Sequence, residues 1–253
     1  MMRPAQFRHE RKYLVSMGEK EALKSRLKPL MATDPHATDG VYIIRSLYFD
    51  DYFDSAYEEK NMGVYARSKY RIRFYDYSDR VIKLERKLKR ENYIFKEDAS
   101  LTREEVERIL NGDVSFCLTS PQPLLQEFYC EYVSKVLRPR VLVDYDREPF
   151  LLEDGTVRVT FDLDLRVPVM SGDIFDPSLP VVHVMDADML VMEVKFTEFL
   201  PQVIRQIVPP KAAEISAVSK YVFCCERTAF LRGYGYYRDA ETHYSYWQRE
   251  GAP

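Results

Sequence analysis

The segment Lys69-Tyr70-Arg71-Ile72-Arg73-Phe74-Tyr75 alternates between charged or polar residues and large apolar ones. Successive side chains of a β-strand point to opposite faces, so its basic residues would share one face and its apolar residues the other. A half-buried strand usually carries a mixed polar set on its wet face. Here that set is almost entirely basic, which predicts a strand with a specialised charged face.

A period of two recurs along the chain and predicts eight strands, near 5–14, 41–50, 65–77, 80–89, 92–98, 140–150, 156–162 and 188–197. Most are consecutive and joined by short connections, which favours antiparallel pairing. Several of these strands have a charged face of the same kind. The faces hold Arg8, Glu10 and Lys12; Lys83, Glu85 and Lys87; Arg158, Thr160 and Asp162; and Glu193 and Lys195.

Helix signals separate the strands. Ser16-Met17-Gly18-Glu19 and Thr102-Arg103-Glu104-Glu105 are capping boxes that precede apolar residues at helical spacing. Amphipathic runs predict further helices at 124–137, 201–208 and about 219–231. We therefore predict one α+β domain over residues 1–232, followed by a Tyr-rich C-terminal tail over 233–253.

The total charge hides a local excess of basic residues. The chain has 37 Lys and Arg against 40 Asp and Glu, and 46% of its residues are hydrophobic, which excludes a disordered chain and a simple nucleic-acid-binding tail. Residues 60–96 alone contain 12 basic and 4 acidic residues. These figures favour a folded domain with one strongly basic region.

The apolar strand faces need cover, and the predicted amphipathic helices would supply it from outside. The charged faces would then line an interior, as in an eight-stranded antiparallel β-barrel with a basic lumen coated by helices. The alternative is that these faces simply point to water.

A wet basic lumen suits a polyanion, because Arg binds phosphate oxygens bidentately and Lys supplies a mobile charge. The sparse carboxylates Glu10, Glu85, Asp162 and Glu193 suit a divalent cation that bridges to phosphates. This pattern predicts metal-assisted triphosphate or polyphosphate chemistry. It disfavours duplex nucleic acid, which requires an exposed basic face and a higher pI.

The sequence also predicts a location. The N-terminal segment lacks the apolar core of a secretory signal, and no stretch approaches the length of a membrane span. Of four cysteines, Cys224 and Cys225 are vicinal, which is poor geometry for an ordinary disulfide. We expect a cytoplasmic protein with reduced thiols and no membrane insertion by this chain.

Eight short motifs, in order along residues 5–231, carry a family resemblance. They are Phe7–Tyr13, Arg45–Asp50, Tyr70–Tyr75, Leu84–Lys87, Tyr145–Phe150, Val157–Asp162, Met192–Phe196 and Ser219–Tyr221. Together they resemble the polyphosphate polymerase domain of the vacuolar transporter chaperone (VTC) complex. That family belongs to the CYTH-like triphosphate tunnel metalloenzymes, whose eight-stranded antiparallel barrel encloses a basic channel.

The resemblance implies roles for individual residues. Its phosphate-binding positions fall on Lys12, Arg71, Arg73, Lys87, Arg147, Arg158, Ser219 and Lys220, with Lys96 and Lys60 as further contacts. Arg8, Lys83 and Lys195 join this set because they share the charged strand faces. Glu193 matches the family's metal-binding glutamate, and Glu10 and Glu85 are further metal candidates. We expect Lys12, Arg71, Arg73, Lys87, Glu193 and Lys220 to carry catalysis.

One position departs from the family pattern, because Ala217 stands where the fungal motif has a basic residue. Arg45 fits better as a salt-bridge partner on the exterior than as a phosphate contact. The Tyr-rich faces are assigned to core packing rather than to a base-stacking platform.

The resemblance implies an ATP-dependent polyphosphate polymerase that uses Mn²⁺ or Mg²⁺ and moves the γ-phosphoryl group of ATP onto a growing polyphosphate. Two alternatives remain open at this point: a tunnel triphosphatase, which uses water as acceptor, and a non-catalytic polyphosphate-binding module. The expected partners are ATP or another triphosphate and inorganic polyphosphate, with room for a separate membrane partner. Nucleic acid is not among the expected partners.

Overall fold

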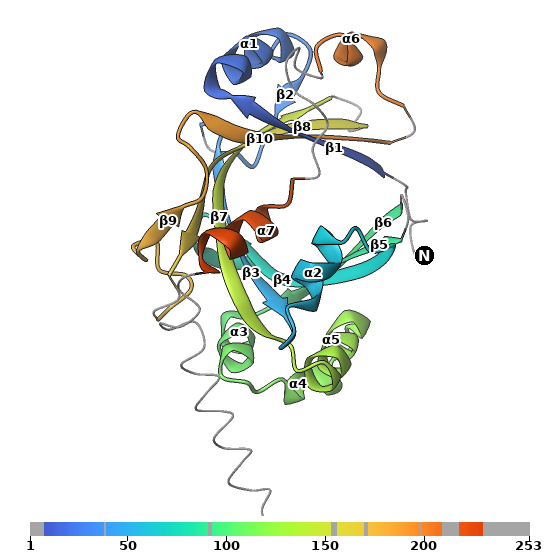
Figure 1. Cartoon of the computed structure of the whole chain (residues 1–253), viewed down its shortest axis with the longest axis vertical. Coiled ribbons are helices and arrows are strands. Elements are labelled where there is room, and N and C mark those ends of the chain that lie inside the picture. The colour runs from blue at the N-terminus through green and yellow to red at the C-terminus, as the bar shows by residue number, and fades with distance from the viewer. Residues whose placement is uncertain are drawn as a thin grey trace, which may run out of the picture.

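The computed structural model describes residues 8–37, 39–90, 93–152, 156–169, 172–197, 199–208 and 218–229. One antiparallel sheet runs through the molecule in the order β1-β10-β8-β7-β3-β4-β5-β6 (Figure 1). Its long strands are β1 (Arg8–Ser16), β3 (Tyr42–Asp50), β4 (Ala66–Tyr75), β5 (Ser78–Arg90), β6 (Tyr93–Leu101), β7 (Arg138–Leu151), β8 (Val157–Pro168) and β10 (Met189–Thr197). Two short strands extend it, β2 (Ala32–Thr33) beside β7 and β9 (Val181–His183) beside β8.

All eight predicted strands are present, and most ends shift by only a few residues. The strand predicted at 156–162 extends to Pro168, and residues 5–7 of the first predicted strand lie outside the described residues. The alternation in β4 has the predicted effect, because Tyr70, Ile72 and Phe74 are all buried on one face. The short strands β2 and β9 were not predicted, since two or three residues are too few to show a period.

Seven helices lie within the described residues: α1 (Met17–Leu27), α2 (Ser55–Asn61), α3 (Arg103–Leu110), α4 (Ser115–Leu118), α5 (Pro123–Ser134), α6 (Gln202–Arg205) and α7 (Lys220–Arg227). Both predicted capping boxes form. In the first, Ser16 Oγ accepts from the Glu19 amide at 3.2 Å, while Glu19 Oε2 accepts from the Ser16 amide at 2.9 Å. The helices α2 and α4 were not predicted, and α6 is shorter than the predicted run at 201–208.

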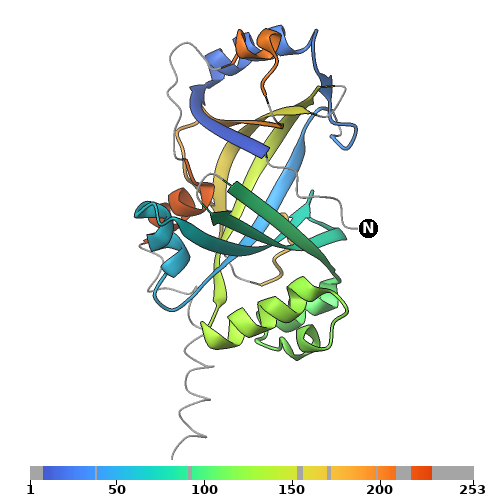
Figure 2. The same ribbon diagram turned by 90° about the vertical axis from the view of Figure 1, so that its right-hand side faces the viewer.

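The helices cover the sheet in separate groups (Figures 1 and 2). Helices α3, α4 and α5 pack on the apolar face of β4 and β5, where Phe128 of α5 contacts Tyr70 at a ring distance of 5.3 Å. Helices α1 and α6 share a second cluster with β1, β8 and β10, and α7 packs in a third cluster with β3 and β7. The predicted role of the helices as an outer coat is confirmed for these faces.

The sheet itself is not closed. In the part of the chain that the structure describes, β1 and β6 end the strand order, and no backbone pairing joins them. An ion pair connects β1 to β5, the strand next to the β6 edge, since Lys87 Nζ of β5 lies 3.0 Å from Glu10 Oε2 of β1. The expected closed eight-stranded barrel is therefore not confirmed.

Helix length and hydropathy bear on the membrane prediction. None of the helices within the described ranges is long and apolar enough to cross a membrane. The predicted C-terminal tail over 233–253 lies outside the described residues.

Candidate functional site

A cavity of about 340 Å³ opens on the charged face of the sheet. It is bounded by side chains of β1, β3, β4, β5, β6, β7 and β10, of α2, and of the N-terminal end of α7. Its basic lining consists of Lys12, Lys60, Arg67, Lys69, Arg71, Arg73, Lys87, Lys89, Arg147, Lys195 and Lys220. Only two carboxylates, Glu10 and Glu193, line it within the described residues. Charged faces of β1, β4, β5 and β10 therefore contribute to one shared space.

Strand β4 supplies a continuous row of cations to this cavity. Because alternate residues share a face, Arg67, Lys69, Arg71 and Arg73 all lie along it. Arg71 is fixed by two hydrogen bonds, from Nε to Glu85 Oε2 at 2.7 Å and from Nη1 to the Tyr48 hydroxyl at 2.7 Å. These bonds set the direction of its guanidinium group before any ligand arrives.

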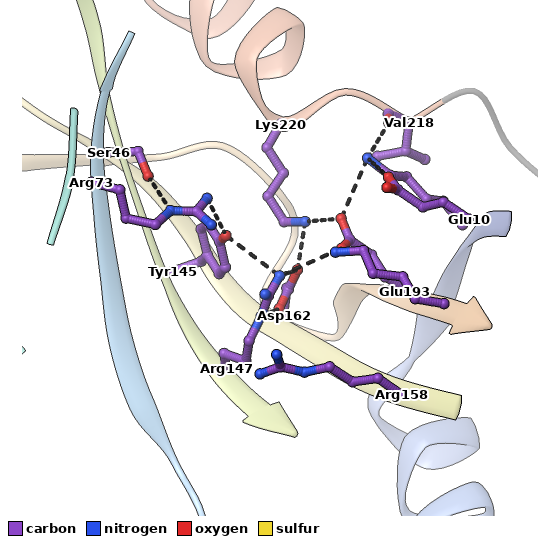
Figure 3. A network of polar contacts seen from close by, with 12 residues as sticks. Glu10, Ser46, Arg73, Tyr145, Arg147, Arg158, Asp162, Glu193, Val218 and Lys220 are labelled. Carbon is purple, nitrogen blue, oxygen red and sulfur yellow. Dashed lines mark hydrogen bonds and ion pairs between the residues drawn. The ribbon is translucent and has the colours of Figure 1, made fainter. Parts of the chain in front are cut away.

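Glu193 lies at the centre of a cationic cluster (Figure 3). Its carboxylate oxygens lie 2.9 Å from Lys220 Nζ, 3.1 Å from Lys195 Nζ, 3.3 Å from Lys12 Nζ and 3.5 Å from Arg147 Nη2. Burial alone would raise the pKa of Glu193, but these four cations hold it well below its usual value. Glu193 is therefore ionised over the whole physiological pH range.

A second buried carboxylate, Asp162 of β8, supports the same cluster. Arg147 binds it bidentately, with Nε and Nη2 donating at 2.6 and 2.7 Å, and Lys220 Nζ lies 2.5 Å away. Lys220 is the first residue of α7, and Ser219 caps that helix by accepting from the Val222 amide at 3.4 Å. Burial would lower the pKa of Lys220, but Asp162 and Glu193 raise it above its usual value. Lys220 thus stays charged although it is only 7% exposed.

The edge of the cavity near β1 has its own carboxylate. Glu10 lies 3.3 Å from Lys12 Nζ and 3.0 Å from Lys87 Nζ. Burial opposes ionisation of Glu10, yet Lys12 and Lys87 lower its pKa. Lys12 also donates to the carbonyl of Val218 at 3.3 Å, which connects β1 to the segment before α7.

Most of the predicted site residues meet in this cavity. The predicted residues that line it are Lys12, Lys60, Arg71, Arg73, Lys87, Arg147, Lys195, Ser219 and Lys220, together with Glu10 and Glu193. These residues come from seven elements and from the N-cap of α7, so the fold assembles them from distant parts of the chain.

Four other predicted residues do not line the cavity. Lys83 Nζ donates to Ser100 at 2.8 Å, and Lys96 Nζ lies 2.5 Å from Glu85. Glu85 is 2% exposed and forms an ion pair with Arg71, whose Nη2 lies 2.6 Å from Glu85 Oε2. Arg158 donates to Asp34 and to the Tyr42 hydroxyl, at 3.1 and 2.6 Å.

Two further predictions fall where the structure gives no side chain. The backbone of Arg8 begins β1, but its side chain lies outside the described residues, as does the whole of Ala217. Arg45 is a salt-bridge partner as expected, bonded to Asp144 at 2.8 Å, but it is 1% exposed and so buried instead of exterior.

Several cavity residues were missed by the sequence-based prediction. Arg67, Lys69 and Lys89 continue the predicted charged faces of β4 and β5, so the alternation contained a signal for them. Tyr48, Tyr145 and Tyr221 also line the cavity, although the Tyr-rich faces were assigned to the core. Each tyrosine belongs to the core and to the cavity wall, because it is at least 90% buried while its hydroxyl bonds a charged group. The pairs are Tyr48 with Arg71, Tyr145 with Arg73 and Tyr221 with Asp50.

The donor set partly determines which metal ion would fit. The described residues contain no group of three or more His, Cys, Asp or Glu side chains placed to hold a metal ion. Mg²⁺ commonly binds through one or two carboxylates and completes its coordination with substrate phosphates and water. Glu193 and Glu10, which lie in the cavity with ionised carboxylates, fit that kind of shared site.

These features define a class of protein: an α+β domain whose curved antiparallel sheet carries a buried, cation-rich cavity with a few fully ionised carboxylates. The sequence matches the VTC domain over residues 7–229. The chain therefore belongs to the VTC domain family, and the resemblance inferred from its eight motifs is confirmed.

Comparison with other proteins adds little to this assignment. No curated protein matches the sequence. The structure is similar to that of bh2851 from Bacillus halodurans, with 14% identity, a TM-score of 0.49, and coverage of 81% of this chain and 90% of that one. It is also similar to PH1819 from Pyrococcus horikoshii OT3, with 10% identity, a TM-score of 0.44, and coverage of 87% and 99%. Neither reaches a TM-score of 0.5, so the family assignment rests on the sequence match.

Proposed function

We propose that this protein is an ATP-dependent polyphosphate polymerase, which transfers the γ-phosphoryl group of ATP to the end of a polyphosphate chain held in the cavity. The observation that carries the proposal is the lining of the cavity, where eleven basic side chains face two carboxylates in a member of the VTC domain family. Such an excess of cations in one enclosed space is costly unless a polyanion neutralises it.

The basic residues differ in the contact that each would make. Arg71, Arg73 and Arg147 are held by hydrogen bonds to buried tyrosine and carboxylate groups. The direction of each guanidinium group is therefore set, and its remaining N–H groups can donate to phosphate oxygens. Lys87 and Lys195 have more exposed side chains, 39% and 33%, and supply mobile charge at the entrance.

The reaction needs positioning more than acid–base chemistry. The acceptor is a terminal phosphate oxygen that is already ionised, and the bond that breaks joins the γ-phosphorus to the bridging oxygen of the leaving ADP. Basic groups aligned along the phosphates would bring these atoms together and neutralise the charge on the transferred group.

The metal would be held by the chain and the substrate together. When bound, Mn²⁺ or Mg²⁺ would neutralise charge on the phosphate oxygens beside Glu193 and Glu10. The chain's own contribution is to keep Glu193 ionised, which Lys220, Lys195, Lys12 and Arg147 ensure. They also occupy its oxygens, so phosphate groups that bind these cations would release the carboxylate for the ion.

One experiment separates the proposed function from its alternatives. Purified protein is incubated with ATP and Mn²⁺, and the phosphate species are resolved on a gel. Long phosphate ladders with stoichiometric ADP support the polymerase. Inorganic phosphate without ladders overturns it in favour of the triphosphatase, and polyphosphate binding without turnover overturns it in favour of the binding module.

A further inference from the structure

Lys69 is an unusual member of the cationic row on β4. Its side chain lines the cavity between Arg67 and Arg71, yet its Nζ atom is buried without a hydrogen-bond partner. Among the described residues only two other buried side-chain atoms lack a partner, on Arg158 and Thr160, and neither residue lines the cavity. A buried amine without an acceptor is costly, so this position invites an explanation.

Burial disfavours a positive charge on Lys69. A cation–π contact partly offsets this, because Nζ lies 4.2 Å from the ring centroid of Tyr221 on α7. The backbone of Lys69 is paired with that of Lys87 on β5. The charged and titratable groups that act on it are Lys60 on α2, Arg67 beside it on β4, Asp50 at the end of β3, and Cys225 on α7, with Glu59 of α2 also near.

Of the two carboxylates in that set, Asp50 is constrained by hydrogen bonds within the protein. Asp50 accepts hydrogen bonds from the Tyr221 hydroxyl and from the amides of Asp51, Ala56 and Tyr57, so its charge is largely used within the protein. Burial lowers the pKa of Lys69 to about 7, with Arg67 and Lys60 acting in the same direction and Asp50 opposing them. Without a ligand, a large share of Lys69 is therefore a neutral amine near neutral pH.

We propose that Lys69 is a further phosphate contact, which takes up a proton from solvent when a polyphosphate chain occupies the cavity. This inference rests on the proposed binding of polyphosphate in that cavity, but not on the polymerase reaction. The amine accepts one proton from the buffer, and the resulting ammonium donates to phosphate oxygens that replace its missing partner.

The geometry of β4 explains why the position matters. Alternate residues of a strand are about 6.8 Å apart, so Arg67, Lys69, Arg71 and Arg73 span about 20 Å of the cavity wall. A neutral Lys69 leaves a gap of about 14 Å between the charges on either side of it. Protonation of Lys69 closes that gap when polyphosphate binds. Before binding, a neutral Lys69 lowers the repulsion among the cations of β4, and after binding a charged Lys69 adds a phosphate contact.

Isothermal titration calorimetry with a polyphosphate of defined length tests this inference. Titrations at pH 8 in two buffers of different ionisation enthalpy, Tris and HEPES, give the number of protons taken up on binding. With a starting pKa of about 7, Lys69 is about 10% charged at pH 8, so it should take up about 0.9 proton. Other groups, Lys87 among them, add to the total, so the comparison with variants is decisive.

Lys69→Met and Lys69→Arg should each lower the uptake by about 0.9 proton, because methionine does not titrate and arginine is always charged. Lys135→Met, at the exposed C-cap of α5, should leave it unchanged. The affinity of the wild type relative to Lys69→Arg should fall about tenfold between pH 6 and pH 8, since protonation must then be driven by binding.

Unchanged proton uptake in Lys69→Arg, with polyphosphate still bound, would overturn the role of Lys69 and leave the proposed function standing. Absence of polyphosphate binding to the wild type would instead overturn the proposed function, and this inference with it. If Lys69→Met does not fold, as circular dichroism would show, Lys69→Arg decides the question alone.

Discussion

Replacing Glu193 by glutamine probes the centre of the site with almost no change in shape. The substitution removes the negative charge that lies within 3.5 Å of four cationic groups, on Lys12, Arg147, Lys195 and Lys220. Breaking a buried ion pair from one side typically costs about 3 to 5 kcal/mol, because it leaves charge uncompensated. We expect the free energy of unfolding of the free protein to fall by that amount, which corresponds to a fall in Tm of about 6 to 20 °C.

The ligand should reverse the effect on stability but not the effect on turnover. Polyphosphate brings negative charge to the same cations, so its stabilising shift in Tm should be larger in Glu193→Gln than in the wild type. Turnover of ATP in the presence of Mn²⁺ should be lost, because the proposed metal-holding carboxylate is gone. Differential scanning fluorimetry with and without polyphosphate, and gel analysis of products, measure the two quantities.

A matched control comes from another buried carboxylate. Glu148 pairs with Lys20 and Lys24 at 2.5 and 2.6 Å, is 7% exposed and lies outside the cavity. Glu148→Gln should destabilise the protein comparably, while turnover and the polyphosphate-induced shift in Tm stay those of the wild type. Normal turnover in Glu193→Gln would refute the metal assignment, and an unchanged Tm without ligand would refute the buried ion-pair cluster itself.

Arg71→Glu should abolish polyphosphate binding in an equilibrium binding assay, whereas the surface variant Lys135→Glu should bind normally; retained affinity in the first would show that this strand face does not hold the ligand. Arg45→Met removes the ion-pair partner of the buried Asp144, which lies outside the cavity. The free energy of unfolding, measured by urea denaturation, should fall by about 3 to 5 kcal/mol, while polyphosphate binding stays normal. Thr102→Ala removes the cap of α3 and should cost about 1 kcal/mol in the same measurement. Folding lowers the pKa of Glu193, so this residue stabilises the protein at pH values above its ordinary pKa of 4.5, and the stabilisation is lost as the pH falls below that value. At acid pH the free energy of unfolding of the wild type should therefore fall more steeply than that of Glu193→Gln.

The buried carboxylates organise the cations of the cavity. Glu193, Asp162 and Glu10 hold Lys220, Arg147, Lys12 and their neighbours close together despite their like charge. Phosphate groups would have to compete with these carboxylates for the cations, so affinity should depend on how many contacts a chain makes at once. Long chains should consequently bind better than single phosphates.

Local patterns allowed much of the fold to be predicted. The capping boxes at Ser16 and Thr102 placed the starts of α1 and α3, since a cap needs only residues within one helical turn. The alternation in residues 69–75 placed β4 and both of its faces. The short helix α2 was not predicted, because Asp54 at its N-terminus has a left-handed conformation (φ 53°) and its side chain makes no capping bond. Its stabilising contacts come instead from Asp50, which accepts from the amides of Ala56 and Tyr57.

The candidate site was predicted in its composition more than in its arrangement. Strand alternation placed Arg71, Arg73 and Lys195 on a charged face, and the family resemblance added Arg147 and Lys220. Nothing local distinguishes Lys83, which lies on the same strand face as Lys87 yet bonds Ser100 outside the cavity. Lys87 instead pairs with Glu10 of β1, a strand far away in the sequence, so the difference is a long-range property.

The sequence by itself determined the alternation of β4, the eight strands, the capped helices and the family of this protein, because those properties depend on residues that are neighbours in the chain or on motifs in a fixed order. Only the tertiary structure decided that the sheet stays open between β1 and β6, that Glu193 is surrounded by four cations, and that Lys69 lacks a partner. The physical reason is that ion pairing, burial and closure depend on distances between strands far apart in sequence, and the charge of a side chain responds to those distances.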